Sequence, residues 1–164
     1  MSAYQYSDVH PSLKLLEENW QVIRAEYLAA ANKVTLWPEE FLHNGLWDVL
    51  GIHYPERTMP GASLCPRTKE LVQRIPGLLL AGFSILRPGC VVLPHMGAVH
   101  GVWRSHLGLI CPQDAWLEVL GERYVAREGK VVVFDDSNLH SAGNQGESDR
   151  VVLIVDFWKQ DAAI

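Results

Sequence analysis

The chain has 164 residues, of which 48% are hydrophobic and 20% charged, and its formal net charge is −5. This composition excludes a disordered chain, and the length suits one globular domain that can bury a core without disulfides. The acidic balance gives no support for nucleic acid or an anionic membrane as a partner, and the longest apolar runs are too short to span a bilayer.

The first third of the chain predicts helices and loops. Apolar residues recur at steps of three and four from residue 13 onward, which predicts an amphipathic helix over 13–32. Residues 37–61 show no steady period and are expected to be mostly irregular. A second, short helix is expected over 66–75, where a Pro-Gly pair ends it.

From residue 77 onward the pattern is typical of β-structure. Apolar or alternating runs between glycine-containing turns predict strands over 78–86, 99–110, 116–120, 123–127, 130–134 and 150–158. The last run is apolar on both faces, so we expect it to be a central strand. Short strands at this spacing are typical of a sandwich or barrel, and we expect a mainly β fold, a cupin-like jelly roll (double-stranded β-helix) with N-terminal covering helices.

The three cysteines, Cys65, Cys90 and Cys111, form no CxxC pair, so neither a disulfide framework nor a structural zinc site is indicated. Their apolar neighbours predict buried thiols in a reducing compartment. We therefore expect a cytoplasmic protein.

Seven histidines are many for this length, and two of them, His95 and His140, stand at the ends of strand patterns beside turn residues. In a jelly roll, strand ends this far apart in the chain can meet. Two neutral imidazoles brought together would bind a divalent metal such as Fe(II). The alternative is that each histidine is simply solvated or hydrogen-bonded near its turn.

A basic set accompanies these histidines. Val102, Arg104 and His106 alternate and therefore point to one face of their strand. An arginine in an apolar strand is costly to bury unpaired, and Arg150 at the start of the last strand raises the same question. One explanation is a structural ion pair; the other is an anionic small molecule beside the metal, such as a dicarboxylate, with Ser84 as a hydroxyl donor.

Several short motifs follow one another in the second half of the chain: Ser84-Ile85, Arg87-Pro88-Gly89, Pro94-His95-x-Gly97, Arg104-x-His106-Leu107-Gly108-Leu109, Gly129-Lys130-Val131, Phe134-Asp135-Asp136-Ser137-x-x-His140, and Arg150 through Val155-Asp156-x-Trp158. With these motifs the segment resembles the aspartyl/asparaginyl β-hydroxylase family of Fe(II)- and 2-oxoglutarate-dependent dioxygenases. The resemblance covers a little under half of the chain. It implies a single catalytic domain over 1–164, with 1–76 as helical or irregular cover and 77–160 as a β-barrel core.

The resemblance also implies the metal ligands. The family binds iron with two histidines, which correspond to His95 and His140 here. Gly97 stands where related oxygenases carry an acidic ligand. Asp135 and Asp136 are expected to be turn formers; orientation of His140 is the first alternative, and direct ligation of the metal is less expected.

The cosubstrate contacts follow in the same way. The resemblance implies that Ser84 and Arg150 hold the distal carboxylate of 2-oxoglutarate. It places Arg104 and His106 near the 1-carboxylate. Fe(II), 2-oxoglutarate and O2 are thus the expected cofactors.

The implied reaction is hydroxylation of an unactivated carbon, such as a β-carbon, with release of succinate and CO2. We expect an amino acid, a short peptide or a natural-product intermediate as substrate, because Val102 replaces an arginine that some family members use for an acidic side chain. A lipid substrate is less expected, since the chain shows no membrane segment. Trp103, Trp116 and Trp158 are expected in the core.

Two alternatives to hydroxylation stay open. The vacant iron position could serve a 2-oxoglutarate-dependent halogenase or another oxidative tailoring enzyme. A jelly-roll module that binds a carboxylate without catalysis is the other alternative.

Overall fold

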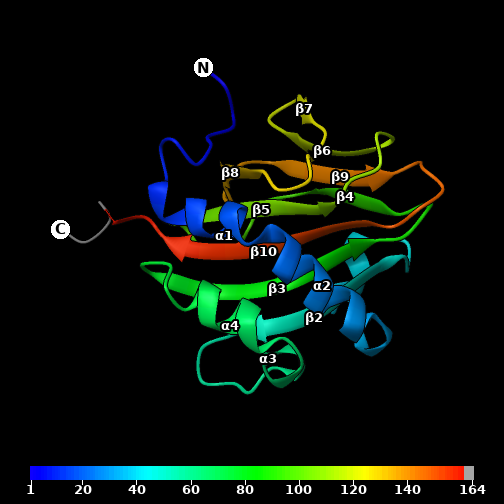
Figure 1. Ribbon diagram of the computed structural model, residues 1–164. Helices are drawn as coiled ribbons and strands as arrows, with labels where there is room; N and C mark the ends of the chain where they lie inside the picture. Colours follow the sequence, from blue (N-terminus) through cyan, green and yellow to red (C-terminus); the bar gives the residue numbers. More distant parts are fainter. Residues whose placement is uncertain (161–164) are drawn as a thin grey trace.

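The computed structural model describes residues 1–160, in which two antiparallel sheets face each other and helices cover one of them (Figure 1). The strands are β1 (Thr35–Leu36), β2 (Trp47–His53), β3 (Leu78–Leu86), β4 (Val91–His95), β5 (Val102–Ile110), β6 (Ala115–Val119), β7 (Glu122–Tyr124), β8 (Val131–Asp135), β9 (His140–Asn144) and β10 (Arg150–Trp158). The helices are α1 (Lys14–Glu18), α2 (Trp20–Ala30), α3 (Pro60–Leu64) and α4 (Pro66–Val72), and 3-10 turns span Pro11–Leu13, Ala31–Lys33 and Glu40–Leu42.

The larger sheet has the strand order β1-β2-β3-β10-β5-β8 and the smaller one β4-β9-β6-β7. This arrangement confirms the predicted mainly β jelly roll with helices near the N-terminus. Strand β10 lies between β3 and β5, and only its last residue, Trp158, is exposed. The prediction of a central strand is therefore confirmed.

The helices pack on one face of the larger sheet. Phe83 of β3 and Leu153 and Val155 of β10 point toward this face and are fully buried with Ile23 and Leu71 of the helices. Side chains alternate between the two faces of a strand, so the neighbouring residues point the other way, toward the smaller sheet. The helix layer thus leaves the inner face of the sheet free for a site.

The predicted N-terminal helix is interrupted. The Asn19 side chain donates to the carbonyl oxygen of Leu15 at 2.8 Å, and helix α1 ends there before α2 begins. A side-chain amide that competes for helical carbonyls in this way favours a helix end. The second predicted helix is shorter than expected and corresponds to α4.

The prediction that residues 1–76 form only helical or irregular cover is wrong. Strands β1 and β2 extend the larger sheet, and β2 pairs with β3 from Trp47 to His53. Strands β4 and β9 were not predicted either. The sequence of β9, His-Ser-Ala-Gly-Asn, has no apolar alternation, and this strand is held by pairing with β4 and β6 on its two sides.

The cysteines differ in burial. Cys65 and Cys90 are buried as predicted, and burial raises the pKa of each thiol to about 11. Cys111 is only partly buried, which corrects the prediction for that residue. Within residues 1–160, no helix combines the length and apolarity needed to cross a bilayer.

Candidate active site

His95 and His140 meet at the paired ends of two strands. His95 closes β4, His140 opens β9, and the two residues are direct partners across the antiparallel pair. Their ring centroids are 4.3 Å apart. The fold thus brings together two histidines that are 45 positions apart in the chain.

Both imidazoles are oriented by the backbone. The Nδ1 atom of each ring lies 2.7 Å from a carbonyl oxygen two residues earlier, that of Leu93 for His95 and that of Asn138 for His140. A carbonyl oxygen only accepts, so Nδ1 must carry the proton, and Nε2 of a neutral ring then keeps its lone pair. This is the tautomer in which histidine binds a metal through Nε2.

The environment of His140 keeps its ring neutral. Burial is the main cause that lowers its pKa to about 4, and the positive charges that His95 and Arg104 can carry act in the same direction. The Nε2 atom is buried and has no hydrogen-bond partner among residues 1–160. A buried acceptor without a partner is costly and indicates that something else binds there.

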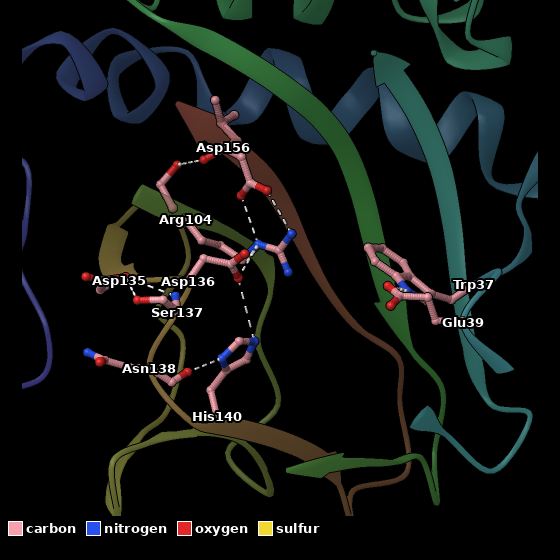
Figure 2. A network of polar contacts seen from close by, with 11 residues as sticks. Trp37, Glu39, Arg104, Asp135, Asp136, Ser137, Asn138, His140 and Asp156 are labelled. Carbon is pink, nitrogen blue, oxygen red and sulfur yellow. Dashed lines mark hydrogen bonds and ion pairs between the residues drawn. The ribbon is translucent and has the colours of Figure 1, made fainter. Parts of the chain in front are cut away.

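Asp136 supplies a second acceptor at the same place. Its Oδ1 is also buried without a hydrogen-bond partner among the described residues, and it lies 3.8 Å from Nε2 of His140 (Figure 2). Two acceptors that face each other need a cation or a hydrogen-bond donor between them. A divalent metal on the histidines, with a bound water facing Asp136, fits this arrangement.

The place of Asp136 depends on Gly97. The Gly97 amide donates to the Asp136 carbonyl oxygen at 2.8 Å, and a Cβ added to Gly97 would overlap the Asp136 carboxylate. Asp136 therefore occupies the space that an acidic side chain at position 97 would need. Among the described residues, no group of three or more histidine, cysteine, aspartate or glutamate side chains is arranged to hold a metal ion.

The two aspartates before His140 have different roles. Asp135 accepts hydrogen bonds from the amide and the hydroxyl of Ser137 and pairs with Lys159. It is the turn former that the sequence predicts. Asp136 lies in the same turn, but its side chain is buried and faces His140, which is the arrangement that the alternative role of orienting His140 requires.

Arg104 is held in an ion pair. Its Nε and Nη2 atoms each lie 2.8 Å from one carboxylate oxygen of Asp156, the residue opposite it on β10, and Nε is 3.5 Å from Oδ1 of Asp136 (Figure 2). Burial by itself disfavours the charged guanidinium, but the neighbouring carboxylates outweigh it and raise the pKa of Arg104. The structural ion-pair explanation therefore applies to Arg104, and its contact with a cosubstrate stays a prediction.

Arg150 is different. It is 3% exposed, and among the described residues no carboxylate lies within ion-pair distance of its guanidinium. Burial lowers the pKa of Arg150 to about 10, which still leaves it charged at neutral pH. A buried cation without a carboxylate partner is suited to bind an anionic ligand.

Ser84 and His106 line the cavity between the two sheets, together with His95 and His140. The Trp47 indole donates to the Ser84 hydroxyl at 2.8 Å, which leaves the hydroxyl proton of Ser84 free to donate to a ligand. Burial, with Arg150 and Arg104 nearby, holds the pKa of His106 well below its ordinary value. The predicted site residues His95, His140, Ser84, Arg104 and His106 thus line one cavity, and Arg150 lies on the same sheet face.

Local residue patterns do not identify Trp47 as a site residue. Trp47 lies in β2, whose sequence has no steady hydrophobic period. Trp47 comes to lie beside Ser84 only because β2 pairs with β3. Trp158 was expected in the core, but it is 42% exposed and lines a larger pocket next to the site. His100 is exposed and lines neither cavity.

The fold and the paired histidines define a jelly-roll protein with a candidate two-histidine metal centre. A family profile described as Aspartyl/Asparaginyl beta-hydroxylase matches residues 17–160. The chain belongs to this family, as the sequence motifs predicted.

Curated relatives agree with this assignment. An ornithine lipid ester-linked acyl 2-hydroxylase of Rhizobium tropici is 46% identical over 98 residues, which are 58% of this chain and 35% of that protein. The human aspartyl/asparaginyl beta-hydroxylase is 32% identical over 157 residues, 89% of this chain and 21% of the human protein. The chain therefore spans about a third or less of the length of these relatives.

Solved structures support the fold. HygX from Streptomyces hygroscopicus, with nickel and 2-oxoglutarate bound, superposes with a TM-score of 0.63 at 10% identity and covers 86% of this chain and 79% of HygX. A prolyl hydroxylase from Trichoplax adhaerens superposes with a TM-score of 0.57 at 11% identity, covering 88% and 80% of the two chains.

Proposed function

We propose that this chain is an Fe(II)- and 2-oxoglutarate-dependent dioxygenase that hydroxylates an unactivated carbon. The overall reaction joins a substrate C–H, O2 and 2-oxoglutarate, and yields the C–OH product, succinate and CO2. The observation that carries this proposal is the pair of buried acceptors, His140 Nε2 and Asp136 Oδ1, which face each other without a hydrogen-bond partner among the described residues. The family of the chain and its fold support it.

Each part of the site has a share in this reaction. His95 and His140 would hold the iron through Nε2, and the buried Asp136 carboxylate would orient a water on it. Iron with 2-oxoglutarate and O2 supplies the oxidising chemistry, in which the cosubstrate is decarboxylated and one oxygen atom enters the substrate. Arg150 and Ser84 would hold the distal carboxylate, and burial around His140 keeps bulk solvent away from the reacting centre.

The position of Asp136 favours hydroxylation over halogenation. A halogenase needs a chloride ion where an acidic ligand is missing, which is the space beside Gly97. Here the Asp136 carboxylate occupies that space, and a chloride ion would be repelled by it. Hydroxylation needs only water at this position.

The metal site is tested by anaerobic titration with Fe(II) and 2-oxoglutarate. We expect the weak visible charge-transfer band of an iron–oxoglutarate chelate, and its loss in His140→Ala. The matched control is His100→Ala, an exposed histidine outside the site, which should keep the band. A band of unchanged intensity in His140→Ala would contradict the proposed metal site.

The cosubstrate site is tested with Arg150→Met, which keeps the apolar stem and removes the charge. The concentration of 2-oxoglutarate needed for half of the band should rise at least about tenfold, while Fe(II) binding is retained. The exposed Arg123→Met is the control. Succinate release in the presence of a substrate then decides between an enzyme and a non-catalytic carboxylate-binding module.

A further inference from the structure

An outer pocket of about 650 Å³ adjoins the histidine pair, and Trp37 forms part of its wall. The inner cavity between the two sheets, where Ser84 lies, is lined by Trp47 instead. The two spaces share His95 and Arg104. Each of the two tryptophans therefore faces a different part of the site, Trp37 the outer pocket and Trp47 the inner cavity.

The two indoles are stacked on one another. Strand β1 pairs with β2, with Leu36 opposite Asp48, and this pairing brings Trp37 next to Trp47. The ring centroids are 4.0 Å apart and the ring planes differ by 5°. The Trp37 amide also donates to the Trp47 carbonyl oxygen at 2.8 Å. One face of the buried Trp47 ring is therefore covered by Trp37.

His43 contacts the same indole from a second side. The Gly45 amide donates to Nδ1 of His43 at 3.0 Å, so a neutral ring carries its proton on Nε2, which lies 3.0 Å from the Trp37 carbonyl oxygen. The His43 ring meets Trp47 in a T-shaped contact, with centroids 5.7 Å apart and an angle of 79° between the planes. Stacked and T-shaped contacts are favoured geometries of aromatic pairs. Two rings thus hold the Trp47 indole against rotation.

The orientation of this indole determines one hydrogen bond in the inner cavity. The Trp47 N–H donates to the Ser84 hydroxyl at 2.8 Å, and Ser84 is 2% exposed. Hydrogen bonds weaken steeply when the donor turns away from the acceptor. A rotated Trp47 would therefore release the Ser84 hydroxyl, whose own proton would no longer be kept free for a ligand.

The other end of the stack belongs to the outer pocket. The Trp37 indole N–H donates to Oε1 of Glu39 at 3.3 Å, and both side chains line the pocket (Figure 2). Trp37 is only partly buried. A molecule that fills the outer pocket therefore contacts one end of a chain of contacts that leads from Trp37 through Trp47 to Ser84.

We propose that Trp37 is a positioning residue for the cosubstrate site and couples the outer pocket to it. Through the stack, Trp37 sets the direction of the Trp47 N–H and thereby of the Ser84 hydroxyl. A molecule bound against Trp37 holds the stack in place and strengthens the binding of 2-oxoglutarate. The effect is reciprocal, because a coupling free energy acts equally on both ligands. This role rests on the proposed dioxygenase function.

The positioning role is tested on the full chain with Fe(II) under anaerobic conditions. The measurement is the 2-oxoglutarate concentration that gives half of the charge-transfer band. Trp37→Leu should raise this concentration about two- to fivefold, within the range for one weakened hydrogen bond. Trp37→Phe keeps a ring that can stack and should restore most of the affinity. The Fe(II) affinity should stay unchanged, because the stack leads to Ser84.

Double variants separate positioning from a general loss of structure. Because Trp37 acts through the Trp47 N–H, Trp37→Leu should have no further effect in a Ser84→Ala or a Trp47→Phe background. The matched control is Trp116→Leu on β6, a partly buried tryptophan that packs on Arg123 and should leave the 2-oxoglutarate requirement unchanged. Thermal unfolding shows that each variant is folded. An unchanged requirement in Trp37→Leu, or an equal further loss in both backgrounds, would overturn the positioning role.

The coupling is measured by circular dichroism of the protein loaded with Zn(II), which histidines also bind and which does not turn over. Stacked indoles give an exciton couplet, which should vanish in Trp37→Phe and remain in Trp116→Phe. Saturation with 2-oxoglutarate should strengthen the couplet, because a Ser84 hydroxyl held by the ligand also holds the two indoles. This increase should be lost in Ser84→Ala. A couplet that does not respond to 2-oxoglutarate would overturn the coupling.

Failure of this role and failure of the proposed function give different results. If the unchanged protein forms no charge-transfer band with Fe(II) and 2-oxoglutarate, the proposed function is contradicted, and the role of Trp37 falls with it. If the unchanged protein forms the band and Trp37→Leu forms it at the same 2-oxoglutarate concentration, only the role of Trp37 is contradicted.

Discussion

The two faces of the larger sheet are both buried, yet they differ in chemistry. The outer face, against the helices, is apolar and includes Phe83, Leu153 and Val155. The inner face of the same strands carries five polar or charged residues, Ser84, Arg104, His106, Arg150 and Asp156. All of them are buried except Arg104, whose side chain is 12% exposed. Strand alternation makes this division possible, since neighbouring residues serve opposite faces.

Stability and function share one set of strands in this sheet. Apolar side chains on the outer face stabilise the fold by burial. On the inner face, each buried charge costs free energy unless it is paired or binds a ligand. Arg104 is paired with Asp156, whereas Arg150 has no carboxylate within ion-pair distance in the described chain and is left for a ligand.

The largest effect on stability is expected from the outer face. Phe83 is fully buried and packs on Tyr27, with ring centroids 5.2 Å apart. Phe83→Ala should lower the free energy of unfolding by about 3–5 kcal/mol, through lost burial and the cavity left behind. Urea unfolding measures this. Under conditions where the variant is folded, its Fe(II) affinity should equal that of the unchanged protein, and a large loss of affinity would contradict a purely structural role.

A somewhat smaller loss is expected when the inner ion pair is broken. Asp156→Asn keeps the shape of the side chain but leaves Arg104 with only Asp136 as a charged partner in the pair network. We expect a loss of about 3 kcal/mol in the free energy of unfolding. The double variant Arg104→Met/Asp156→Leu should recover most of it, because it removes both charges. A double variant less stable than Asp156→Asn would contradict this account of the pair.

The smallest effect is expected at Trp47, which should change cosubstrate binding more than stability. Trp47→Phe removes the indole donor to Ser84 and should raise the 2-oxoglutarate requirement about two- to tenfold, the range for one hydrogen bond. Ser84→Ala should raise it too. If Trp47 acts by positioning Ser84, the two effects will not add in the double variant, and additive effects would show that Trp47 acts on the ligand independently.

Part of the candidate site could be predicted from residue patterns. The alternation of Val102, Arg104 and His106 correctly placed them on one strand face, because the period of two is local. The roles of Asp136 and Trp47 could not be predicted in this way. Asp136 faces His140 only because Gly97 leaves space for its carboxylate, and Trp47 reaches Ser84 only through the pairing of β2 with β3.

The sequence by itself determined the family, the jelly roll, the central strand and the pair of histidines that meet at the site, His95 and His140. These follow from motifs and from local hydrophobic periods. Only the tertiary structure decided which arginine is paired, how the buried acceptors face each other and what lines the outer pocket. These properties depend on contacts between strands far apart in the chain, such as β5 with β10 and β4 with β9. Charge and burial at a site are set by such neighbours, and a local pattern does not contain them.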